Sequence, residues 1–186
     1  MQFLTSFVLL LVCYHNPHLC FADEEPVDAE KLLRVTTPLK YILAETTDDF
    51  FGLNVACMTL EILNSTSPYI VVVDYEQDKK WHTLVYDASV SSSSTKGKHI
   101  INFSTGESDA VYGTESYELS YLKESSCFVL SPTGAPSLGC SLWKFLGNYI
   151  EESEKGDCPD MPQGSDCEEE YKNCKSRTGE DQCLAW

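Results

Sequence analysis

The stretch that decides the fold runs from Tyr117 to Cys174. It reads YELSYLKESSCFVL over 117–130, GCSLWKF over 139–145 and DCPDMPQGSDCEEEYKNC over 157–174. Two short apolar runs each begin beside a cysteine, and an acidic loop then leads to a short cysteine-bearing segment. Six of the chain's nine cysteines fall between Cys127 and Cys183. These features indicate a β-structure that disulfides cross-link near its C-terminal end.

The cysteine-bearing segment has the spacing of one helix face. Cys167, Tyr171 and Cys174 stand at i, i+4 and i+7, and Ser165 with Glu168 forms a capping-box pattern. We therefore predict a helix that begins at Ser165 and packs its cysteines on the strands. The acidic run in its first turn is expected on the solvent side, where negative charge suits the helix dipole.

Short β-branched and aromatic segments alternate with turn residues through most of the chain, which predicts eight strands. A short helix within 24–37, closed by Thr37-Pro38, is expected before them. The segment Ser91–Lys98, between the fourth and fifth strands, is expected to be a loop. The expected strands are Leu39–Ala44, Asn54–Leu63, Tyr69–Glu76, Trp81–Val90, His99–Phe103, Ser116–Lys123, Cys127–Leu130 and Gly139–Leu146.

Eight strands at this short spacing favour an antiparallel up-and-down order. Such a set can close into a barrel that holds one small ligand, as in lipocalins. The predicted fold is therefore an all-β, eight-stranded antiparallel lipocalin barrel with a short N-terminal helix and a C-terminal helix. A β-sandwich is the alternative, and periodicity alone does not distinguish the two.

The formal net charge is −16, from 13 basic and 29 acidic residues. Such a charge disfavours nucleic acid and anionic membranes as partners, because both require clustered Lys and Arg. No cofactor is expected. Catalysis also finds little support, since the chain has no G-x-S-x-G, H-E-x-x-H or P-loop pattern.

Residues 1–22 have the pattern of a secretory signal, with an apolar run over Phe3–Val12 and a break at Pro17. The run is too short to span a bilayer. We expect cleavage after Ala22, which leaves a single secreted domain over 23–186.

Cleavage would leave seven cysteines, and an oxidising compartment then implies three disulfides and one odd thiol. Spacing alone does not select the pairs, and a dimer linked through the odd thiol is a minor hypothesis beside the expected monomer. A zinc site is disfavoured, because there is no C-x₂-C pair and no nearby histidine. The seven cysteines are Cys57, Cys127, Cys140, Cys158, Cys167, Cys174 and Cys183.

Two sequons, at Asn64 and Asn102, are candidate glycosylation sites and agree with secretion. A glycan must face solvent. Strand alternation around Asn102 then turns Ile101 and Phe103 inward.

The chain resembles the secreted salivary lipocalins of ticks, the family that includes the histamine-binding proteins. The resemblance extends over essentially the whole mature chain. The residues that carry it are Pro26-Val27-Asp28-Ala29, Cys57, the YELSYL strand before Cys127, Leu142-Trp143 and the ending Cys167, Tyr171 and Cys174. It implies an eight-stranded barrel with a C-terminal helix.

The resemblance also implies two disulfides. One joins Cys57 to the C-terminal region, and we expect Cys174 or Cys183 as its partner. The other joins Cys127 to the segment after Trp143, with Cys158 or Cys167 as its partner.

Amine-binding members of that family typically carry an acid directly after the cysteine of the next-to-last strand and another at the start of the last strand. Phe128 and Ser141 occupy those two places here. If Cys127 points out to a disulfide, alternation turns Phe128 and Leu130 inward. If Lys144 faces water, Ser141, Trp143 and Phe145 face inward.

A protonated amine in a dry cavity needs carboxylates, because an unpaired buried charge costs several kcal/mol. The two replacements therefore favour an apolar ligand (a lipid, an eicosanoid or a sterol-like molecule) that the protein would remove from a host. Histamine or serotonin is the alternative ligand, if a strand acid faces inward. The candidate ligand-binding residues are Trp143, Phe128, Leu130, Phe145, Trp81, Tyr41, Glu61, Asp74 and Glu118.

Trp81 and Tyr86 lie five residues apart on one strand, so they cannot both face the interior. A second class of function is a protein-binding inhibitor that acts on complement or immune cells through its outer loops. The long segments Ser91–Lys98 and Asn148–Gly164 would supply the surface for this host immune protein.

Overall fold

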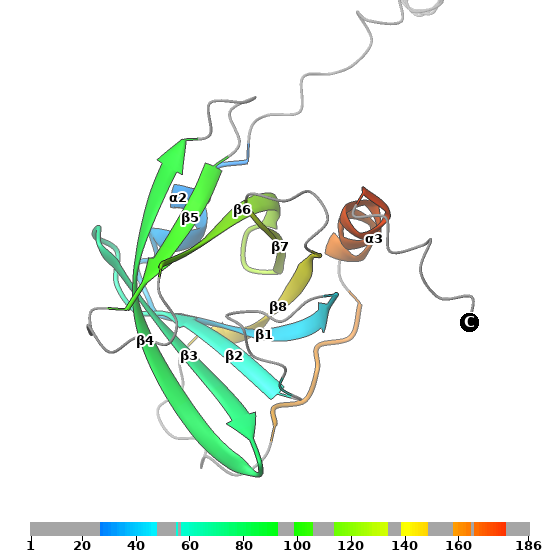
Figure 1. The fold of residues 1–186 in the computed structure, drawn as a ribbon, viewed down its shortest axis with the longest axis horizontal. Helices are drawn as coiled ribbons and strands as arrows, with labels where there is room; N and C mark the ends of the chain where they lie inside the picture. The colour runs from blue at the N-terminus through cyan, green and yellow to red at the C-terminus, as the bar shows by residue number, and fades with distance from the viewer. Residues whose placement is uncertain are drawn as a thin grey trace, which may run out of the picture.

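Eight strands close into an antiparallel barrel in which each strand pairs with the next and β8 pairs back with β1 (Figure 1). The computed structural model describes residues 27–47, 55, 57–92, 99–105, 114–133, 139–148, 158–164 and 166–177. The predicted up-and-down barrel is confirmed, and the sandwich is excluded. The strands are β1 (Leu39–Thr46), β2 (Cys57–Ile62), β3 (Tyr69–Gln77), β4 (Lys80–Ser92), β5 (His99–Ser104), β6 (Thr114–Lys123), β7 (Cys127–Pro132) and β8 (Ser141–Asn148).

Strand β4 is longer than the sequence predicts. It includes Ser91 and Ser92, which were expected to begin a loop, because both pair with β5. The amide of Asn102 donates a hydrogen bond to the Ser91 hydroxyl at 3.0 Å. Residues 93–98 lie outside the described part of the chain.

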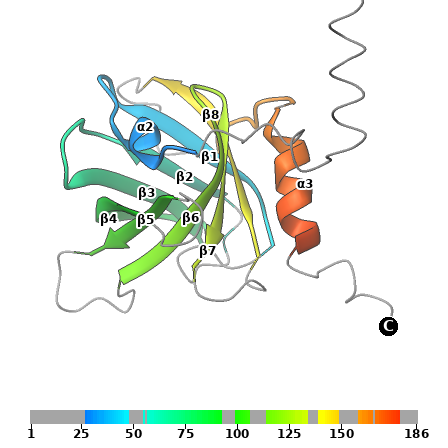
Figure 2. The ribbon, with the colours of Figure 1, turned by 90° about the horizontal axis from the view of Figure 1, so that it is seen from above.

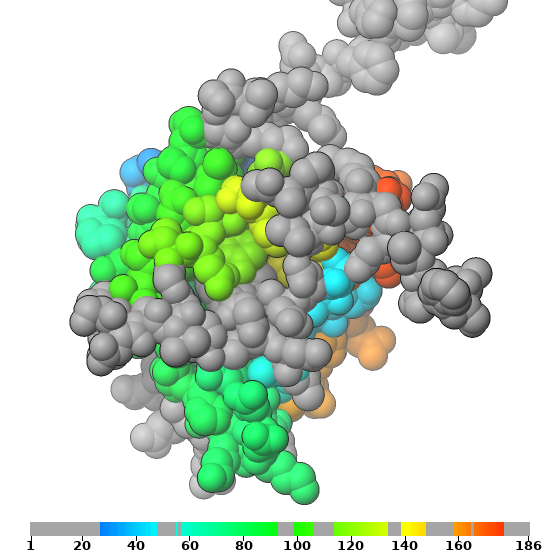
Figure 3. Space-filling view, viewed as in Figure 1, coloured from blue at the N-terminus to red at the C-terminus, as the bar shows by residue number. Residues whose placement is uncertain are grey.

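The β3–β4 hairpin turns at Asp78 and Lys79. Both have positive φ angles, 52° and 61°. Two successive residues with positive φ characterise the type I′ turn, whose twist matches that of the flanking strands. Figures 1 and 3 show this hairpin extending away from the rest of the barrel.

Helix α2 (Ala29–Leu33) covers one end of the barrel (Figure 2). The Asp28 carboxylate caps it by accepting a hydrogen bond from the backbone N–H of Glu30 at 2.9 Å. Ala29, Leu32 and Leu33 are buried and pack with the inward side chains of the strands. The helix is therefore shorter than the predicted segment, but its apolar face closes the core at this end.

Helix α3 (Cys167–Arg177) lies against the outer face of β6, β7 and β8 (Figures 1 and 2). Cys167, Tyr171 and Cys174 are buried there with Val129 and Leu142. The predicted cysteine face is confirmed, while its predicted cap at residue 165 lies outside the described residues. Neither helix in the described part of the chain is long and apolar enough to span a bilayer.

Three disulfides join the strands to the C-terminal segment. The Cys127–Cys167 bond is one of the two alternatives that the resemblance implied for Cys127. The expected pairing of Cys57 with Cys174 or Cys183 is wrong, because Cys57 bonds to Cys158. Helix α3 packs on β6 to β8 and not on β2, so Cys174 instead reaches the residue that precedes β8, and the third disulfide is Cys140–Cys174. Residue 183 lies outside the described part of the chain.

Lys144 does not face water as the sequence predicted. It is on the outer side of β8, but it is only 7% exposed. Its ammonium donates to the Glu168 carboxylate at 3.0 Å and to the carbonyl of Pro162 at 3.3 Å. Glu168 in the first turn of α3 thus balances a buried cation, so this end of the acidic run is not simply solvated.

Replacing Cys57 and Cys158 together by alanine should lower the free energy of unfolding by about 2–5 kcal/mol. The loss should exceed that of the matched Cys140 and Cys174 double variant. The first disulfide spans 101 residues and the second spans 34, and a longer loop restricts the unfolded chain more. Denaturant titration of both variants measures the difference, and equal losses would contradict the loop-length explanation.

Candidate functional site

The inner wall of β7 and β8 is apolar. Phe128, Leu130 and Trp143 belong to the core cluster inside the barrel, with Phe145 packed against it. Their neighbours Cys127, Val129, Cys140 and Leu142 form a separate cluster outside the barrel with α3. The outward disulfides therefore fix the alternation as the sequence predicted.

Four aromatic side chains from β1, β7 and β8 pack together inside the barrel. The ring of Tyr41 lies 4.9 Å from that of Phe128, edge to face, and 5.5 Å from that of Phe145. Phe128 and Trp143 are stacked, with centroids 5.9 Å apart and planes 9° apart. Offset and edge-to-face pairs of this kind stabilise an apolar surface beyond area burial alone.

Ser141 satisfies the polar end of this cluster. The indole N–H of Trp143 donates to the Ser141 hydroxyl at 3.0 Å, and both residues are buried. Ser141 stands where amine-binding relatives were expected to carry an acid. Its hydroxyl is neutral and already accepts the hydrogen bond from Trp143.

A second aromatic group, from β4, β5 and β6, was not among the predicted ligand contacts. The ring centroid of Phe103 lies 6.1 Å from that of Tyr86 and 5.9 Å from that of Tyr117. The sequon at Asn102 had predicted the inward side of Phe103, and Ile101 and Phe103 are both buried. Alternation along β6 from Leu119 could have identified Tyr117 as well.

Trp81 does not line the interior. Tyr86 and Ala88 of β4 belong to the core cluster, and β4 pairs with β3 without a register shift. Trp81 therefore shares the outer face with Val85, which is 56% exposed. Alternation predicted that Trp81 and Tyr86 face opposite sides of the sheet, and Tyr86 is the one that faces the interior.

Glu61, Asp74 and Glu118 all lie on the outer face. Asp74 accepts a hydrogen bond from the Thr83 hydroxyl at 2.6 Å and lies 4.0 Å from the ammonium of Lys40. Each of the three acids stands between two inward neighbours, among which are Leu60, Val73 and Leu119. The structure thus brings none of these predicted residues to the interior.

Glu61 is buried although it faces outward. It is 6% exposed, and its Oε1 has no hydrogen-bond partner among the described residues. Burial raises the pKa of the Glu61 carboxyl, Lys40 lowers it and Asp74 raises it further. The charged form is therefore held less favourably in the folded protein than in water.

Glu115 is the acid that the sequence analysis missed. It pairs across the sheet with Phe103, and cross-strand partners share a face, so it points to the inner side of β6. Its carboxylate accepts a hydrogen bond from the Tyr117 hydroxyl. Glu115 lies near the barrel end opposite α2, where β6 begins.

The family model of the tick histamine-binding protein matches residues 23–183. The chain belongs to this family. Comparison with curated proteins gave no match, and comparison with solved structures gave none. The family and the barrel are those of ligand-binding proteins and not of enzymes.

Both sequons of this family member lie at the outer surface. Asn64 sits in the β2–β3 loop, where its amide donates to the carbonyls of Thr66 and Pro68 at 3.0 and 3.2 Å. Asn102 is on the outer face of β5 and bonds to Ser91 and Ser116. Their use as glycosylation sites remains a prediction.

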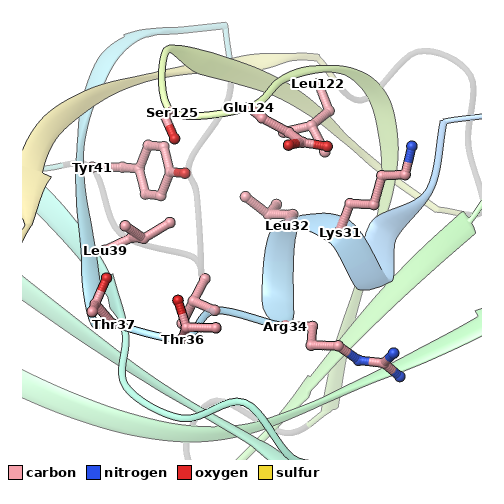
Figure 4. A pocket seen from close by; sticks show the side chains of 11 residues that line it. Lys31, Leu32, Arg34, Thr36, Thr37, Leu39, Tyr41, Leu122, Glu124 and Ser125 are labelled. Atoms are coloured by element: carbon pink, nitrogen blue, oxygen red, sulfur yellow. The ribbon is translucent and has the colours of Figure 1, made fainter.

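A pocket of about 300 Å³ opens at the α2 end of the barrel (Figure 4). Its walls come from α2 and the residues that follow it, from the start of β1, and from the β6–β7 turn. Tyr41 links it to the interior, because its ring packs on Phe128 while its side chain also lines the pocket. Burial and the nearby Glu124 carboxylate raise the pKa of Tyr41 to about 12, so its hydroxyl is neutral at physiological pH.

The variant Glu61→Gln should be more stable than the wild type at about pH 7 and gain less at about pH 4. The pKa of Glu61 is raised on folding, so its contribution to stability is complete below the usual value of 4.5 and is lost as the pH rises through the raised pKa. Glutamine does not ionise, so the variant keeps its stability as the pH rises. Urea unfolding at the two pH values measures the difference in free energy of unfolding, with Glu45→Gln at an exposed strand position as the control. A gain of equal size at both values would contradict the assignment.

Proposed function

We propose that this protein is a secreted salivary lipocalin that holds a small apolar or amphipathic host molecule inside its barrel. A fatty acid, an eicosanoid or a sterol is the class of ligand favoured. Its removal would suppress host inflammation, haemostasis or immunity. The single observation that carries the proposal is an aromatic inner wall from which Glu61, Asp74 and Glu118 are all turned away.

The cost of desolvation distinguishes the two ligand classes. A protonated amine taken from water into a closed barrel needs a carboxylate partner. Phe128 and Ser141 stand where the family resemblance led us to expect acids, and Ser141 already accepts from Trp143. An apolar ligand needs no such partner, and each Å² of apolar surface it buries contributes about 25 cal/mol.

Secretion fits the covalent structure. Three disulfides require an oxidising compartment and are consistent with an extracellular protein. The family match begins at residue 23, where the expected signal would end. The signal itself lies outside the described residues, so its cleavage remains part of the proposal.

The mature protein secreted from insect cells should carry an apolar ligand that native mass spectrometry detects and organic solvent extracts. Calorimetry with histamine and serotonin should then show no binding. Tight binding of either amine, with no extractable ligand, would overturn the apolar assignment.

Restoring the missing acids should reverse the preference. Phe128→Asp and Ser141→Glu place a carboxylate against the aromatic cluster, so each should weaken a bound fatty acid about tenfold or more, equivalent to about 1.4 kcal/mol. The matched control is Val85→Asp, which adds an acid at an exposed outer position. Competition with a fluorescent fatty acid measures the change, and circular dichroism verifies folding. Unchanged affinity in Ser141→Glu would place the ligand elsewhere.

Glu115 favours a second candidate function, the binding of a biogenic amine. Its carboxylate faces the inner side of β6 and already accepts from Tyr117, so a cation could be balanced at that end of the barrel. In that case Glu115→Gln should abolish histamine binding, whereas it should leave a fatty acid bound. Calorimetry on this one variant separates the two ligands.

The protein-binding inhibitor stays a prediction from the sequence. Much of the two loops that would form its surface, residues 93–98 and 149–157, lies outside the described part of the chain. The monomeric state also remains an expectation. Neither is needed for ligand binding inside the barrel.

A further inference from the structure

The pocket at the α2 end differs in chemistry from the aromatic interior. Its apolar surface comes from Leu32, Leu39 and Leu122, which pack on or belong to the core cluster, together with the ring of Tyr41. Hydroxyl groups of Thr36, Thr37 and Ser125 also line it (Figure 4). A ligand here would rest its apolar part on the side chains that close the barrel and would keep its polar part near solvent.

Two opposite charges line the same pocket from different elements. Lys31 extends from α2 and Glu124 from the β6–β7 turn, and Figure 4 shows both along one side of the pocket. Neither has an ion-pair partner among the described residues. Arg34 also lines the pocket, but its guanidinium is paired with Glu30 at 2.8 Å and extends away from Lys31 and Glu124 in Figure 4.

This arrangement discriminates by charge. A ligand with only a positive charge would be attracted by Glu124 but repelled by the ammonium of Lys31. A ligand with only a negative charge would be attracted by Lys31 but repelled by Glu124. A ligand that carries both charges can satisfy both side chains. The volume of about 300 Å³ lies at the small end of the range for ligand pockets, which excludes a long-chain lipid from fitting entirely within it.

We propose that this pocket binds a small zwitterion with an apolar body, of the size and class of an aromatic amino acid. Glu124 pairs with the ammonium of the ligand and Lys31 with its carboxylate. The apolar body lies on Leu32, Leu39 and Tyr41. The two charged contacts are exposed at the rim, whereas Leu32 and Tyr41 also belong to the core cluster of the barrel.

Three probes that share a phenylethyl body and differ in the charged groups they carry test the proposal on the mature protein. L-phenylalanine carries both charges, phenethylamine lacks the carboxylate and 3-phenylpropanoate lacks the ammonium. Affinities measured by calorimetry should be highest for phenylalanine. The expected advantage is about two- to fivefold over each analogue, the scale of an exposed ion pair.

Two variants then assign the charges. Glu124→Gln should weaken phenylalanine and phenethylamine about two- to fivefold and leave 3-phenylpropanoate unchanged or tighter. Lys31→Gln should weaken phenylalanine and 3-phenylpropanoate and spare phenethylamine. Both positions are exposed, so neither change threatens folding. Glu169→Gln and Lys172→Gln, at exposed positions on α3, are the matched controls and should change nothing.

Several outcomes would overturn the zwitterion site. These are no binding of any probe, equal affinity for all three, or a preference that Glu124→Gln and Lys31→Gln leave intact. If the α3 control variants changed the affinities equally, the net charge of the protein and not a contact in the pocket would explain the effect. Binding of phenethylamine that responds to Glu115→Gln alone would place the amine inside the barrel and likewise overturn this site. An empty barrel interior would defeat the proposed function and leave this inference standing.

Discussion

The alternation of side chains along a closed sheet is the constraint on which the rest of this structure depends. In a barrel each strand residue faces either the interior or the surface, and one fixed residue determines the orientation of its neighbours. Cys127 supplies that fixed point on β7, because its disulfide partner Cys167 lies in a helix outside the barrel. The side chains of Phe128 and Leu130 must then face the interior. Trp143 on β8 is the cross-strand partner of Phe128, so it faces the interior as well.

The outer face of this barrel is less simple than its interior. Lys144 and Glu61 both point outward, and both are buried. The first is neutralised by Glu168 of α3, whereas the second retains an oxygen without a hydrogen-bond partner among the described residues. Outward orientation on a strand therefore does not equal exposure where other parts of the chain lie over the sheet.

That difference separates what the sequence could predict from what it could not. Periodicity placed all eight strands within a few residues, because alternation is a local property of each segment. The Cys57 partner was predicted wrongly, since it depends on which strands α3 covers, a non-local fact. The faces of Asp74 and Glu118 were left open because neither β3 nor β6 carries a cysteine or a sequon. Glu61 shares its face of β2 with Cys57, so the outward disulfide of Cys57 could have placed that acid outside. Glu115 was missed because the predicted strand begins at Ser116, whereas β6 begins at Thr114.

The two bridges that hold α3 have a further consequence. Cys127–Cys167 attaches the first half of the helix to β7, and Cys140–Cys174 attaches its second half to the residue that precedes β8. If a protease cut the backbone once between Asn148 and Asp166, the fragments would stay joined by at least these two disulfides. The cleaved protein would keep β8 beside α3. Its resistance to proteases would therefore depend on the disulfides and not on an intact backbone.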